Sequence, residues 1–153
     1  MSGDEMVQIV DDAADSILVQ GLADWLSFIE IQGEVIAAAR EHAVQLWFSS
    51  GAVAMEHLRS DEHVDEWFEE RVRVTMAVLR FMFDQQLIRP GGIMNGFEVW
   101  AGTPDEWLAR IESEWRRFGS ALSISDVCWL ELTDEGMRRA LELEEANGRD
   151  ADC

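Results

Sequence analysis

The chain has 153 residues, of which 48% are hydrophobic, so it can bury the core of one domain and is not a disordered tail. Its formal net charge is −19, which argues against nucleic acid as a direct partner because phosphate contacts need a basic surface. All 12 basic residues are arginine, which excludes the lysine of a P-loop, of a kinase site or of a Schiff base.

The first third of the chain is predicted to be helical, and it carries no basic residue before position 40. Apolar residues at helical spacing predict a first helix over residues 6–17. Residues 16–21 either end that helix or form a short strand, because a short apolar run fits both. A second short amphipathic helix is predicted over 22–29, stopping near Gly33, and a third over 35–46.

Residues 61–87 are the segment around which the rest of the chain is expected to pack. Residues 52–59 predict a short helical connector to this segment, and Ser60 is a plausible N-cap. The segment is apolar around most of a helical circumference, which is typical of a buried helix, and it ends before Pro90. Its apolar residues are Val64, Phe68, Val72, Met76, Leu79, Phe83 and Leu87 in one row and Trp67, Val74, Val78 and Phe81 beside it.

The last third of the chain combines strands and helices. Residues 97–100 and 127–132 alternate between apolar and polar, which predicts two strands that pair antiparallel as a wing-like hairpin. Between them, Thr103-Pro104-Asp105-Glu106 is a capping box that begins an inserted helix over 103–118, and Thr133 caps a last helix.

We therefore predict an α+β fold, mostly α, with five or six helices around the long central one. The predicted single domain covers residues 1–146, and residues 147–153 form a polar tail.

Two short stretches resemble the winged-helix family. Residues 128–136 read Cys-Trp-Leu-Glu-Leu-Thr-Asp-Glu-Gly, similar to the family's wing strand, Leu-Thr-x-x-Gly turn and closing helix. Residues 87–91 resemble the exit from its recognition helix into the first wing strand. The resemblance implies a winged-helix-like fold and a transcriptional regulator, although the family usually has a tight turn where this chain has residues 103–118. The chain also resembles small uncharacterised acidic proteins of high-GC bacteria that share Val-Cys-Trp-Leu.

No set of residues predicts catalysis, a cofactor or a metal site. His57 and His63, near Asp61 and Glu62, are the only cluster that resembles metal ligands, but their spacing places the two imidazoles on different helix faces. Cys128 with a histidine is a conceivable nucleophile pair, but an inward strand cysteine is usually a small core residue. We expect a protein that is not an enzyme, and a small enzyme without a recognisable motif is one alternative.

The candidate partner-binding residues are the acidic start of the central helix and two strand tryptophans. They are Asp61, Glu62, Asp65, Glu66, Trp67, Glu69, Glu70, Trp100 and Trp129. The helix dipole explains acids in the first helical turn, but not their continuation into the third turn. The two tryptophans lie on strand faces that also carry glutamates, unless the inserted helix folds back over them.

The leading hypothesis is an acidic module that binds a basic protein, as an inhibitor, an immunity protein, an antitoxin or a DNA mimic would. A winged-helix transcriptional regulator, which acts through a partner or as a homodimer, is the alternative. No apolar run approaches the roughly 18 residues of a membrane span. Because the N-terminus also lacks a signal-peptide pattern, we expect a cytoplasmic protein.

Overall fold

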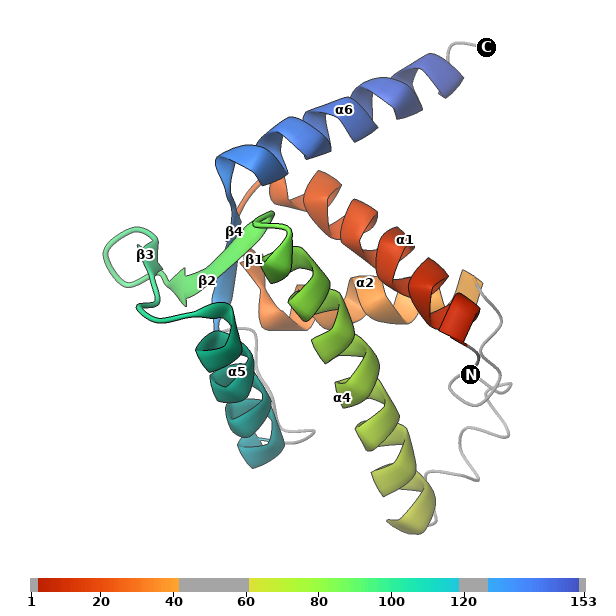
Figure 1. Ribbon diagram of the computed structural model, residues 1–153, viewed down its shortest axis with the longest axis vertical. Coiled ribbons are helices and arrows are strands. Elements are labelled where there is room, and N and C mark those ends of the chain that lie inside the picture. Colours follow the sequence, from red (N-terminus) through yellow and green to blue (C-terminus); the bar gives the residue numbers. More distant parts are fainter. Residues whose placement is uncertain (1–2, 42–60, 119–126, 152–153) are drawn as a thin grey trace.

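The computed structural model describes residues 3–41, 61–118 and 127–151, which form five helices and a four-stranded antiparallel sheet (Figure 1). The elements are, in order, α1 (Gly3–Gly21), β1 (Leu26–Ser27), α2 (Phe28–Glu41), α4 (Asp61–Asp84), β2 (Ile88–Gly92), β3 (Glu98–Val99), α5 (Pro104–Phe118), β4 (Trp129–Leu132) and α6 (Asp134–Ala151). The predicted class, α+β and mostly α, is confirmed.

Helix α4 is the central element, as predicted. It contacts α1, α2, α5 and β2, and Figure 1 shows it running between α1 on one side and α5 on the other. It ends at Asp84, earlier than the predicted end at residue 87. Gln86 adopts a left-handed conformation with φ of 58°, and the Leu87 N–H donates to the Met82 carbonyl at 2.9 Å. This pattern is the Schellman motif that ends many helices.

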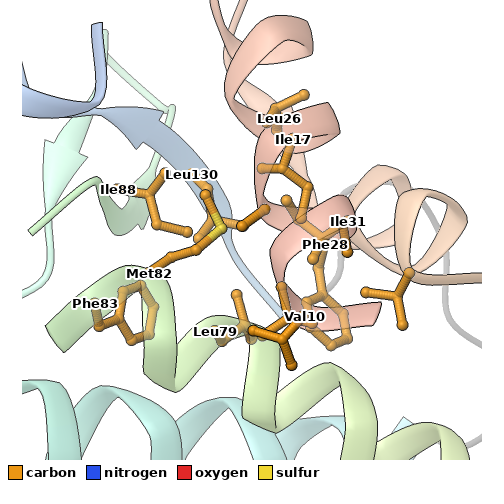
Figure 2. Close-up of a cluster of buried hydrophobic side chains, with 14 of the residues drawn as sticks. Val10, Ile17, Leu26, Phe28, Ile31, Leu79, Met82, Phe83, Ile88 and Leu130 are labelled. Carbon is orange, nitrogen blue, oxygen red and sulfur yellow. The ribbon is translucent and has the colours of Figure 1, made fainter. Parts of the chain in front are cut away.

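The core lies between α1, α2, α4 and the inner face of the sheet (Figure 2). Ile88 and Leu130 from the sheet and Met82 from α4 lie in one cluster with Phe28 and Ile31 of α2. All five side chains are at most 2% exposed, so the sheet and the helices share a single apolar interior.

Helix α5, the predicted inserted helix, is part of this core. The Trp115 ring makes edge-to-face contacts with Phe28 at 5.0 Å and with Phe68 at 5.6 Å between ring centroids. The Trp107 ring meets Phe83 in the same geometry at 5.4 Å. Aromatic pairs of this kind stabilise a fold beyond the area they bury, so α5 and α4 form one packed unit.

The predicted elements of the first third require correction. Residues 16–21 belong to α1, and the predicted helix over 22–29 is wrong because Leu26 and Ser27 form strand β1. The Ser27 hydroxyl accepts from the Glu30 N–H at 3.3 Å and so caps α2, which continues through Gly33. The sequence from Ser27 to Glu30 is therefore a Ser-x-x-Glu capping box that marks the start of α2. The predictions for residues 42–46 and 52–59 and for Ser60 lie outside the described residues.

The predicted pairing of residues 97–100 with 127–132 is also wrong. The strand order is β1-β4-β2-β3, so β2 lies between β3 and β4. Ile88–Gly92 form strand β2, directly after the central helix. The Pro90 carbonyl accepts from Trp100 N–H at 3.0 Å. The proline nitrogen, which has no hydrogen to donate, therefore also faces the short edge strand β3, where proline is tolerated, and not β4.

The Leu-Thr-x-x-Gly stretch is a packing junction between α4 and α6. The Thr133 N–H donates to the Leu87 carbonyl at 3.0 Å, and the Thr133 hydroxyl accepts from Gly136 N–H at 3.0 Å, which confirms Thr133 as the N-cap of α6. A Cβ at Gly136 would lie 2.0 Å from the Leu87 carbonyl oxygen, so only glycine fits. Helix α6 then continues to Ala151, past the predicted domain end at residue 146.

Gly136→Ala is expected to destabilise the protein by about 1–3 kcal/mol or more, because its Cβ meets backbone that cannot move aside easily. Gly33→Ala is the matched control: nothing lies within 4 Å of its Cβ, and alanine is expected to stabilise α2 by about 0.5–1 kcal/mol. Urea unfolding measures both changes. Equal stabilities of the two variants would contradict the close contact at Leu87.

Phe83→Ala is expected to lower the free energy of unfolding by roughly 3–5 kcal/mol, because Phe83 is only 2% exposed and packs on Trp107. The sequence alone predicted the same severe loss for Phe81→Ala. Phe81 is half-buried at the edge of the core, so we now expect a clearly smaller loss. Urea unfolding of both variants tests this order, and a larger loss for Phe81→Ala would contradict the described packing.

Candidate functional site

The acidic start of α4 is only partly described. The backbone of Asp61, Glu62, Asp65, Glu66 and Trp67 is helical, and their side chains lie outside the described residues. Among the acids of this run, the structure therefore describes the side chains of Glu69 and Glu70 alone.

Both of these acids bind arginines of the same chain. Arg116 of α5 donates to the two carboxylate oxygens of Glu69 at 2.5 and 3.0 Å, and this bidentate pair lowers the pKa of Glu69. Glu70 forms an ion pair with Arg73 one turn later in α4. A partner that bound the Glu69 carboxylate would have to displace Arg116, which also donates a hydrogen bond of 3.5 Å to Glu112.

Trp100 lies on the core side of the sheet. It stands opposite Pro90, and its half-buried ring packs against the core. The guanidinium of Arg110 from α5 sits 3.7 Å from the centroid of the ring. The inserted helix therefore covers this tryptophan, as the alternative prediction stated.

Trp129 lies on the opposite face of the sheet. Leu130 and Leu132 of the same strand point into the core and are 1% and 7% exposed. Because strand residues alternate between faces, Trp129 and Glu131 point outward, and both are half-buried. Trp100 and Trp129 are therefore not brought together. Trp100 lies opposite Pro90 and Trp129 lies opposite Gly91, and these neighbouring residues of β2 face opposite sides of the sheet.

The structure brings other residues to Trp129, and we call this group the outer sheet face. The pairing register places Arg89, Val99, Trp129 and Glu131 on one side of the sheet. Trp25 and Phe97 belong to the same face, because Trp25 bonds Glu131 and its ring lies beside Phe97. Sequence reasoning missed Trp25 because it placed this residue in a helix. It missed Arg89 because it did not predict that the segment after the central helix pairs with residues 129–132. If the register between β2 and β4 were known, Arg89 and Glu131 would be predicted to form a cross-strand ion pair, because they lie directly opposite each other.

Glu131 organises the outer sheet face. One carboxylate oxygen accepts from the Trp25 indole N–H at 3.0 Å, and the other accepts from Arg89 Nε at 2.9 Å. The Trp25 ring also lies 5.8 Å from the Phe97 ring, centroid to centroid. A single carboxylate thus ties β4 to β2 and to the residue that precedes β1.

Gly91 leaves the space in which the Phe97 ring lies. A Cβ at Gly91 would be 2.9 Å from Phe97 Cε1 and 2.3 Å from the Glu98 carbonyl oxygen. A side chain at this position would therefore push Phe97 away from the sheet. The outer sheet face is consequently an aromatic surface with a charged centre, and tryptophan, phenylalanine and arginine are residue types enriched at protein interfaces.

Cys128 lies on the core side and is 3% exposed. Burial, with a smaller effect from the charge of Glu114, raises the pKa of its thiol far above the usual value. The histidines proposed as its partners lie outside the described side chains. Among the side chains that are described, no group of histidine, cysteine and acidic residues is arranged to hold a metal ion.

No family model, curated protein or solved structure matches this chain. None of the described helices has the length and apolar character needed to cross a membrane.

In a Cys153→Ser variant, where Cys128 is the sole thiol, iodoacetamide is expected to leave the folded protein unmodified at a pH of about 8 and to react after unfolding in urea. The reason is that the raised pKa and burial keep the Cys128 thiol protonated and out of reach. Mass spectrometry measures the modification. Rapid labelling of the folded protein would contradict a structural role for this residue.

Proposed function

We propose that the chain is a non-enzymatic, acidic module that binds a basic protein, in the manner of an inhibitor, immunity protein, antitoxin or DNA mimic. The observation that carries this proposal is the way in which the chain uses its positive charges. Six arginines form ion pairs with acids of the same chain: Arg73, Arg80, Arg89, Arg110, Arg116 and Arg138. With a net charge of −19, these pairs leave unmatched acids to dominate the field around the molecule.

Such a field favours one class of partner. A strongly negative surface accelerates the approach of basic proteins and repels nucleic acid, whose phosphates need arginine or lysine contacts. Exposed pairs such as Arg138 with Glu142 add little to stability, so their main effect is to reduce the number of cations available to other molecules.

A winged-helix regulator is the second candidate, and the sheet supports it. Strand β2 follows α4, pairs antiparallel with β4, and β4 leads through Leu-Thr-x-x-Gly into α6, which is the order that the resemblance implies. Helix α4, in the position of the recognition helix, carries three arginines and seven acids, a net charge of 3 − 7 = −4. Direct DNA reading by α4 is therefore disfavoured, and a regulator of this kind would act through a protein partner or as a homodimer.

The proposal predicts that the immobilised protein retains basic proteins from a lysate of its own host at low salt and releases them as ionic strength rises. The physical reason is that the Debye length falls to about 8 Å at physiological salt, which screens exposed charges. Mass spectrometry identifies the retained proteins, and purified candidates are then titrated calorimetrically at several salt concentrations. Duplex DNA under the same conditions is expected not to bind.

Two charge-matched variants separate the acidic start of α4 from the general field. One changes Asp65, Glu66, Glu69 and Glu70 to glutamine, and the other changes Asp134, Glu142, Glu144 and Glu145 of α6 to glutamine. A docking site on α4 predicts a larger loss of affinity in the first variant, while a general field predicts equal losses. Retention of no basic protein by the parent, or binding of DNA, would contradict the proposed function.

A further inference from the structure

We infer that the basic partner docks on the outer sheet face, and that this face accepts a segment presenting an arginine or lysine beside an apolar side chain. This inference rests on the proposed function and adds the place of contact and the chemistry of the segment that is bound. It moves the docking site away from the acidic start of α4.

The first argument is exposure of apolar surface. Figure 2 shows Ile88 of β2 and Leu130 of β4 on the core side of the sheet. Because strand residues alternate between faces, their neighbours in the strands, Arg89, Trp129 and Glu131, point outward. On that outward side Trp25, Phe97 and Trp129 are only half-buried, and Val99 is 44% exposed. Tryptophan is one of the residue types most enriched among the residues that contribute most to binding energy at protein interfaces.

The second argument is that the aromatic side chains are held in place before binding. The Trp25 indole is fixed by its hydrogen bond to Glu131, and its backbone N–H donates to the Asp24 carboxylate at 2.7 Å. The Phe97 ring lies over Gly91 and beside Trp25. Side chains that are already ordered lose little conformational entropy on binding, so more of the contact energy becomes affinity.

The third argument is charge. Asp24 is exposed and directly precedes Trp25, whose N–H it accepts, and Glu131 lies at the centre of the face. The net charge of the whole chain is −19. Arg89 is the one arginine of the outer sheet face, and it is already paired with Glu131. An incoming cation therefore meets more acid than base, beside indole rings.

Cations favour the faces of such rings, and tryptophan binds them best. The chain itself contains such a contact, with Arg110 over Trp100 on the core side. Glu69 and Glu70 of α4 are paired with arginines of the same chain, as Glu131 is, but Phe68 beside them packs against Trp115 in the core. A partner cation thus gains more at the outer sheet face than at the described part of the acidic run.

The test uses a fluorescein-labelled ten-residue peptide that alternates arginine and leucine, with a glutamate–leucine peptide as the negative control. Fluorescence anisotropy measures the affinity of each for the full-length chain. Trp129→Ser is expected to weaken binding of the arginine peptide by at least about tenfold, a loss of about 1.4 kcal/mol. Leu141→Ser on α6 is the matched control, since it removes a side chain that is 58% exposed without changing net charge, and binding should stay within about twofold.

Trp129 is half-buried, so Trp129→Ser could weaken binding by disturbing the fold. A second pair of variants at exposed positions therefore tests the same face. Val99→Arg on the outer sheet face and Leu141→Arg on α6 add the same charge at exposed sites, and only Val99→Arg is expected to weaken binding strongly. Equal binding by parent, Trp129→Ser and Val99→Arg would overturn the inference and leave the proposed function standing. Failure of the parent to prefer the arginine peptide over the glutamate peptide would count against the proposed function and the inference together.

Discussion

The register in which β2 pairs with β4 is the constraint on which the rest of this structure depends. Ile88 opposite Leu132 places one set of side chains in the core, and Arg89 opposite Glu131 places the next set outside. A shift by one residue would exchange the two faces, because side chains alternate along a strand. The register is held by the junction at its end, where Thr133 binds the Leu87 carbonyl and Gly136 allows α6 to approach it.

This register also connects the fold to the proposed function. It leaves Trp25, Phe97 and Trp129 half-buried around one ion pair, while Trp100 lies on the core side under Arg110. Most of the remaining arginines that the structure describes bind acids of the chain itself, so the molecule presents a negative field with one ordered aromatic face. Long-range charge attracts a basic partner in this scheme, and the aromatic face supplies the contacts that hold it.

Several elements could be predicted from local sequence because their causes are local. Apolar spacing along residues 61–87 predicted the buried central helix, and the capping residues Thr103 and Thr133 predicted where α5 and α6 begin. Net charge predicted the class of partner that we still propose. The start of α2 at Ser27 was equally local, but its Ser-x-x-Glu signal was overlooked because the apolar residues around it also fit a helix.

The sequence by itself thus determined the net charge, the buried central helix and the capped starts of α5 and α6. The helix and its caps depend on residues only a few positions apart. Only the tertiary structure decided the strand order, the faces of Trp100 and Trp129, and the assembly of Trp25, Arg89 and Glu131. Those three residues lie far apart in the chain, with Trp25 and Glu131 separated by 106 positions. Strand pairing over such separations depends on which segments the packed core brings together, and no local pattern of residues records that choice.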